Sequence, residues 1–107
     1  YTPSPNTDAR DPQFLVLSDN TLICRFFERT ANKHTVKCIR SSDFGNTYQS
    51  PITLPGSSAP NWTGDAAARG NMLLLNGIIY SVSYDSVRAW LTKSTDSGNT
   101  WSLCIRA

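Results

Sequence analysis

Ser41-Ser42-Asp43-Phe44-Gly45-Asn46-Thr47-Tyr48 and Ser94-Thr95-Asp96-Ser97-Gly98-Asn99-Thr100-Trp101 are two copies of one eight-residue pattern, 53 positions apart in a chain of 107 residues. Both octapeptides have Ser, Asp, Gly, Asn and Thr at the same offsets, and both end in an aromatic residue. A repeat spacing of half the chain indicates a duplicated structural unit.

Each octapeptide contains the residue types that a tight turn needs. The Asp carboxylate can accept hydrogen bonds from backbone N–H groups a few residues further on, and the Gly can adopt a positive φ that a Cβ would resist. The Ser and Thr hydroxyls can satisfy further turn amides, and the final aromatic ring can cover the outside of the hairpin. The sequence therefore predicts a braced β-hairpin at each octapeptide.

The pattern resembles the Asp-box, or BNR repeat, of sialidases and related β-propellers, which reads Ser-x-Asp-x-Gly-x-Thr-Trp. In that family the box occupies the turn between the third and fourth strands of a blade, away from the active site, and its role is structural. The resemblance implies a propeller rather than an enzyme as such, since sorting receptors and glycan-binding proteins have similar boxes. The structural residues that it marks are Ser41, Asp43, Gly45, Thr47, Tyr48, Ser94, Asp96, Gly98, Thr100 and Trp101, of which Tyr48 departs from the Trp of the consensus.

Short apolar or alternating stretches predict four strands in each half of the chain, and no segment has helical periodicity. The expected strands are 14–17, 22–27, 34–40, 48–54, 72–75, 78–82, 87–92 and 101–106. Asn76-Gly77 is a strong signal for a type I′ hairpin. We therefore expect an all-β fold of two four-stranded antiparallel blades, organised as a lead-in segment at 1–9, blade 1 at 10–54, an inter-blade loop at 55–70 and blade 2 at 71–107.

Two blades do not close a propeller, which has about four to eight. The open faces must be covered either by the remaining blades of a longer chain, in a ring of about six, or by identical copies, for example as a trimer. The ending at Ala107, directly after the last expected strand, favours the longer chain.

The composition excludes several classes of partner. The net charge is +2 and charged residues make up 17% of the chain, so no basic stripe suggests nucleic acid. The apolar runs are too short to cross a bilayer, and the first residues show no signal-peptide pattern. We expect a soluble protein without membrane insertion, either associated with a virion or secreted as part of a longer protein.

The three cysteines, Cys24, Cys38 and Cys104, are odd in number and lack C-x-x-C spacing, which favours neither a zinc site nor a disulfide framework. We expect no metal and no cofactor. A hairpin centred on Ala31 would place Cys24 opposite Cys38, and we interpret both as small core residues, with a bridge as the alternative.

Arg10-Asp11-Pro12 resembles the Phe-Arg-Ile-Pro motif through which sialidases begin their first blade, and the later Arg29 matches an arginine that lines their glycan pocket. By this resemblance Arg10 grips the substrate carboxylate. A planar guanidinium offers two parallel donors to a carboxylate, which suits an acidic sugar. The alternatives are that Arg10 pairs with Asp8 or Asp11 and that Arg29 forms an ion pair with the neighbouring Glu28.

The chain departs from an intact sialidase site in ways that leave it without a catalytic residue of its own. Asp11 stands where the motif has Ile, and residues 30–34 include no acid where the family has its acid/base aspartate. His34 is interpreted as a surface residue. The tyrosine–glutamate pair that the family uses as nucleophile has no match, and such a reduced set of acids resembles the phage endosialidase branch.

Two further candidates lie between the blades. Asp65 is interpreted as facing the central cavity, or as an ordinary turn residue beside Gly64, and Trp62 as a ring that stacks on sugars. Trp90 is expected in the core. The sequence therefore predicts part of a sialidase-like glycoside hydrolase that binds sialylated or other acidic glycans. The rival predictions are a non-catalytic glycan-binding module that oligomerises, and a purely structural propeller.

Overall fold

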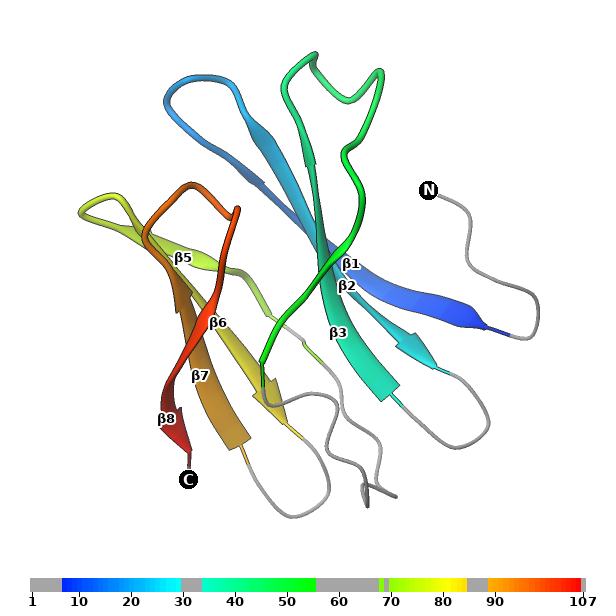
Figure 1. Ribbon diagram of the computed structural model, residues 1–107, viewed down its shortest axis with the longest axis vertical. Coiled ribbons are helices and arrows are strands. Elements are labelled where there is room, and N and C mark those ends of the chain that lie inside the picture. The colour runs from blue at the N-terminus through cyan, green and yellow to red at the C-terminus, as the bar shows by residue number, and fades with distance from the viewer. Residues whose placement is uncertain (1–6, 30–33, 56–67, 69, 85–88, 107) are drawn as a thin grey trace.

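The computed structural model describes residues 7–29, 34–55, 68, 70–84 and 89–106, which form two four-stranded antiparallel sheets (Figure 1). In each sheet every strand lies beside its neighbour in sequence. Sheet 1 contains β1 (Asp8–Val16), β2 (Leu22–Arg29), β3 (His34–Ser41) and β4 (Ile52–Thr53). Sheet 2 contains β5 (Leu73–Leu75), β6 (Ile78–Tyr84), β7 (Ala89–Ser94) and β8 (Ser102–Arg106). The predicted all-β fold of two four-stranded antiparallel sheets is confirmed.

The two ends of the sheets differ in what they carry. The β1–β2 turn and both octapeptide turns lie at one end, at the top of Figure 1. The start of β1 and the end of β2 lie at the opposite end. No helix among the described residues is long and apolar enough to cross a membrane.

Both octapeptides adopt the same braced turn. The Asp43 carboxylate accepts a hydrogen bond of 2.8 Å from the Thr47 amide, and the Ser41 hydroxyl accepts one of 2.8 Å from the Gly45 amide. Ser94, Asp96, Gly98 and Thr100 repeat this geometry with the same distances. The glycines have φ values of 85° and 84°. Because each carboxylate also accepts the Thr hydroxyl, its ionised form is stabilised and the pKa of Asp43 and of Asp96 falls to about 2.

An apolar core lies between the two sheets. Its side chains alternate along β2 and β3 with side chains on the other face, as expected for strands. The buried members of the cluster are Leu17, Ile23, Phe27, Val36, Cys38, Leu54, Ala68, Met72 and Ile79. Trp90 is 4% exposed, which confirms its predicted place inside the protein. Asn76 and Gly77 have φ values of 51° and 77°, as the type I′ hairpin requires.

Two arginines connect sheet 1 to sheet 2. The fully buried Arg25 guanidinium donates to the Ser81 hydroxyl at 3.0 Å and to the Gly70 carbonyl at 2.5 Å. Arg40 donates through Nε to the carbonyl of Ser97, in the second octapeptide, at 2.8 Å. The two sheets therefore share directed polar contacts as well as a core.

The expected pairing of Cys24 with Cys38 is wrong by one residue. Cys24 lies opposite Ile39, and Cys38 lies opposite Arg25, so the two thiols point to opposite faces of sheet 1. The reason is that four residues, 30–33, connect Arg29 to His34, which puts the hairpin centre between two residues instead of on Ala31. All three cysteines are free.

Several strands differ from their predicted extents. β1 begins at Asp8 and so includes two residues assigned to the lead-in, and β4 is limited to Ile52–Thr53. The apolar run 14–17 predicts a strand buried on both faces, but this prediction is wrong, since Phe14 is 58% and Val16 is 61% exposed. Both belong to the face of sheet 1 that points away from sheet 2. The strand expected at 87–92 extends two residues further, to Ser94, and its first two expected residues, 87 and 88, lie outside the described residues.

Candidate functional site

The candidate site lies where β1 of sheet 1 meets Gly70, directly before sheet 2. A hollow of about 590 Å³ opens there, lined by Asp11, Pro12, Gln13 and Gly70. This volume falls in the range of about 300–1,000 Å³ that small-molecule sites occupy. The lining offers a carboxylate, a side-chain amide and backbone groups, which suits a ligand with several hydroxyl groups.

A bulge in β1 shapes one wall of the hollow. The β1–β2 register shifts between Arg10 and Gln13, and Asp11 has a φ of 51°, which is unusual for a residue with a Cβ. Pro12 provides no amide hydrogen, so the ladder of hydrogen bonds between β1 and β2 is interrupted at this point. Strained residues of this kind gather at binding sites, because the surrounding fold holds them in place.

Arg25 supports the opposite wall of the hollow. Its guanidinium holds the carbonyl of Gly70, a residue with a φ of 76° directly before sheet 2. Burial is the main reason that the pKa of Arg25 is lowered from its ordinary value. Sequence reasoning did not single out Arg25. The signal was present, since alternation along 22–27 puts this charge on the same face as Ile23 and Phe27.

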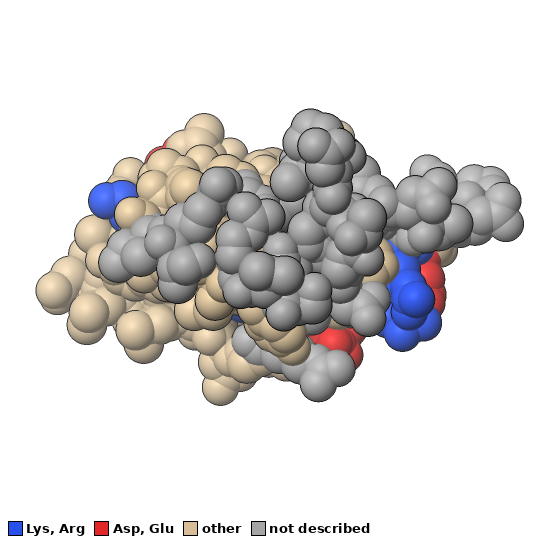
Figure 2. All heavy atoms as spheres, turned by 90° about the horizontal axis from the view of Figure 1, so that it is seen from below, with Lys and Arg blue, Asp and Glu red and all other residues tan. Residues whose placement is uncertain are grey.

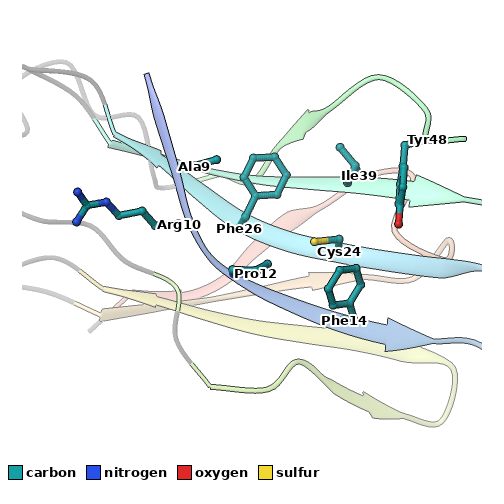
Figure 3. Close-up of a pocket in the computed structure, with 8 residues that line it drawn as sticks. All are labelled: Ala9, Arg10, Pro12, Phe14, Cys24, Phe26, Ile39 and Tyr48. Carbon is teal, nitrogen blue, oxygen red and sulfur yellow. The ribbon is translucent and has the colours of Figure 1, made fainter. Parts of the chain in front are cut away.

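Arg10 lies at the outer end of β1 with its side chain 49% exposed. Its Nε and one terminal nitrogen both approach a single carboxylate oxygen of Asp8, at 2.7 and 2.6 Å. The alternative partner that the sequence suggested is therefore the one observed. Figure 3 shows the guanidinium pointing away from the apolar side chains of β1 and β2, at the end of the sheet.

Arg29 lies at the same end of the sheet as Arg10. Asp8 pairs with Arg29 and Arg10 pairs with Phe27, so the two arginines occupy neighbouring strands on one face. Arg29 is exposed. The alternative ion pair between Arg29 and Glu28 is not formed, because the Glu28 carboxylate binds the ammonium of Lys37 at 3.0 Å on the other face.

His34 differs from its interpretation as a surface residue. It is 6% exposed, and its ring lies 6.2 Å from the ring of Phe27, centroid to centroid. Asp65 and Trp62, the remaining sequence-predicted site residues, lie outside the described residues. The described part of the chain has no group of three His, Cys, Asp or Glu side chains that could hold a metal ion. Viewed from below, basic and acidic atoms lie next to one another at one edge of the molecule (Figure 2).

No family model matches the chain, and no curated protein matches it by sequence. Among solved structures, the Hadza microbial sialidase Hz136 matches 99% of this chain with a TM-score of 0.70 at 19% identity. The fold is sialidase-like. The match covers 26% of the sialidase chain, so this chain spans about a quarter of that protein's length. At this identity the likeness extends to the arrangement of the strands, and the site residues have to be argued on their own.

Proposed function

We propose that this chain forms two blades of a sialidase-like propeller that binds sialylated or other acidic glycans and hydrolyses them. In this proposal Arg10 holds the sugar carboxylate, and Arg29, Asp65 and Trp62 contact the rest of the glycan. The chain supplies no nucleophile. Hydrolysis then requires residues from further blades, as in the glycoside hydrolases whose fold it shares.

The observation that carries the proposal is the way in which Arg10 already holds a carboxylate. Two of its donors converge on one oxygen of Asp8, and about half of the side chain is exposed near the start of β1. An arriving sugar carboxylate can replace that of Asp8, because an exposed ion pair contributes only about 0–1 kcal/mol. The hollow beside the bulge, with Asp11 and Gln13, then offers acceptors and donors to the sugar hydroxyls.

The test is binding of sialyllactose to the chain, measured by saturation-transfer NMR. Arg10→Ala should abolish the transfer, while Asp8→Asn should strengthen it, because the competing internal carboxylate is lost. Lactose, which lacks the carboxylate, is the matched ligand control. Neither variant should change the saturation transfer to lactose. Unchanged binding of sialyllactose by Arg10→Ala would show that the proposed role of Arg10 is wrong.

The same binding site fits a second function, a non-catalytic glycan-binding module that closes its ring by oligomerisation. The observation in its favour is the exposure of large apolar side chains on both sheets, among them Phe14, Val16, Leu73 and Val82. Apolar side chains exposed in this way mark surfaces that other sheets cover. Binding of sialyllactose by an oligomer of this chain alone would favour the module, whereas binding that requires further blades of a longer chain would favour the enzyme.

A further inference from the structure

Sheets 1 and 2 are repeats of one another, and the register identifies their equivalent positions. Arg40 precedes the first octapeptide and pairs with Ile23, whereas Lys93 precedes the second octapeptide and pairs with Tyr80. Arg40 and Ile23 lie on the face of sheet 1 that contacts sheet 2. Lys93 and Tyr80 alternate with buried residues of sheet 2, so they lie on the face that points away from sheet 1.

The contact that Arg40 and Ile23 make is specific to the octapeptide turn. Arg40 donates to the carbonyl of Ser97, the fourth residue of the second octapeptide, which has a φ of 61°. Ile23 packs so closely on Gly98 that a Cβ there would lie 2.9 Å from the Ile23 Cδ1 atom. A cation and an apolar side chain of one sheet thus hold the octapeptide turn of the next sheet.

The equivalent groups on the outer faces, an octapeptide carbonyl on sheet 1 and a cation on sheet 2, have no such contact with the described residues. Phe44, the fourth residue of the first octapeptide, has a φ of 60° and is 80% exposed. Its carbonyl accepts no hydrogen bond from the described residues, and the Lys93 ammonium donates none to them. Within the described residues, sheet 1 therefore has an acceptor without a donor and sheet 2 has a donor without an acceptor.

The two outer faces are also complementary in their apolar residues. Cys38 and Leu91 are 53 positions apart, as the two octapeptides are, so they occupy equivalent positions in the two sheets. Their partners on the neighbouring strands are Arg25 and Val82, so Val82 is the counterpart of Arg25, and it is 48% exposed. Ser81 accepts the hydrogen bond from Arg25. By the same equivalence, its counterpart in sheet 1 is Cys24. Cys24 borders an apolar cavity of about 220 Å³ on the outer face of sheet 1, together with Phe14, Phe26, Ile39 and Tyr48 (Figure 3).

We infer that the outer face of sheet 2 binds the outer face of sheet 1 of a second copy of this chain, with Lys93 donating to the Phe44 carbonyl and Val82 entering the apolar cavity that Cys24 borders. A second copy is the occupant because this chain carries both halves of the contact, one on each sheet. The contact is head to tail, and successive copies form a ring if their rotation closes. The inference rests on the second proposed function, in which identical copies close the ring, and it does not depend on which ligand the protein binds.

Sedimentation velocity of the chain over a wide range of concentrations tests the contact. The sedimentation coefficient should rise with concentration. Val82→Glu places a charge on the outer face of sheet 2, and Phe14→Glu places one on the outer face of sheet 1. Both positions are about half exposed or more, so the fold should persist, which circular dichroism and urea unfolding can check. Each variant alone should be limited to a monomer.

Mixing the two variants distinguishes a head-to-tail contact from a symmetric one. Each variant retains one intact outer face, so an equimolar mixture should form a one-to-one dimer and nothing larger. A symmetric dimer would not be restored in this way. A wild-type chain that stays monomeric at every concentration, or a mixture that does, overturns the inference.

Lys93→Ala tests the polar part of the contact. Loss of a charge-assisted hydrogen bond should weaken association about tenfold. Arg29→Ala is the matched control, since it removes the same charge at the opposite end of the other sheet and should leave association unchanged. Equal effects of the two variants would show that net charge, and not the contact between Lys93 and Phe44, controls association.

Discussion

Arg25 of sheet 1 donates a hydrogen bond of 3.0 Å to Ser81 of sheet 2 in the interior of the protein. The guanidinium is fully buried, and its Nε has no hydrogen-bond partner among the described residues. Removing such a charge from water is costly, so the bonds that remain must offset the loss. The stability of the packed pair of sheets therefore depends on the few acceptors that Arg25 reaches.

Ser81→Ala should destabilise the protein by about 1.5–3 kcal/mol, because it removes an acceptor from a buried charge. Ser83 is the matched control, since it is equally buried on the same strand and its hydroxyl finds no partner in the described part of the chain. Ser83→Ala should be neutral or slightly stabilising. Urea unfolding of the two variants measures the difference, and equal free energies of unfolding would contradict this account.

The octapeptide carboxylates should make the free energy of unfolding depend on pH. The pKa of Asp96 is about 2, below its ordinary value of 3.8, chiefly because the Thr100 hydroxyl donates to it. A lowered pKa in the folded state means that the stabilisation is present above about pH 4 and is lost as the pH falls through 2. Thr100→Val should raise the pKa of Asp96 toward its ordinary value, whereas Thr100→Ser should preserve it. Carbon NMR titration of the carboxyl group measures both.

The parts of the fold that the sequence predicted are those that local chemistry determines. The octapeptide turn is closed by Ser, Asp, Gly and Thr within one short segment, so its geometry follows from its own residues. The Asn76-Gly77 hairpin is predictable for the same reason, since both residues tolerate a positive φ. Alternation along β3 likewise separated Val36 and Cys38 from Lys37 and Ile39.

What the sequence did not predict depends on contacts between distant segments. The Cys24–Cys38 pairing was wrong by one residue because a four-residue connection has no central residue, and alternation alone cannot fix that register. Arg25 was passed over because its acceptors, Gly70 and Ser81, lie in the other half of the chain. The exposure of Phe14 was missed because an apolar run does not tell which of its faces another sheet will cover.

The thiols should differ in reactivity at neutral pH. Cys24 and Cys38 are buried, and burial raises the pKa of both, that of Cys38 to about 12. Cys104 is half-buried. Titration of the native chain with a thiol reagent should therefore modify Cys104 first, and Cys104→Ser should remove the fast phase. Two fast thiols in the native protein, or an untreated chain whose mass is lower by two hydrogen atoms, would contradict the free and buried state of Cys24 and Cys38.

Gly98→Ala should cost more stability than its backbone conformation alone requires. Gly77 has a similar φ, 77° against 84°, but a Cβ on Gly77 would meet nothing within 4 Å, whereas one on Gly98 would lie 2.9 Å from the Ile23 Cδ1 atom. Gly77→Ala should cost about 1–2 kcal/mol from the left-handed conformation. Gly98→Ala should cost about 1–3 kcal/mol more, because it overpacks the contact between the sheets.

Ile23→Val deletes the obstructing methyl group, so it should destabilise the wild type by about 1 kcal/mol but recover stability in the Gly98→Ala background. Additive effects of Gly98→Ala and Ile23→Val would mean that the second octapeptide does not rest on Ile23.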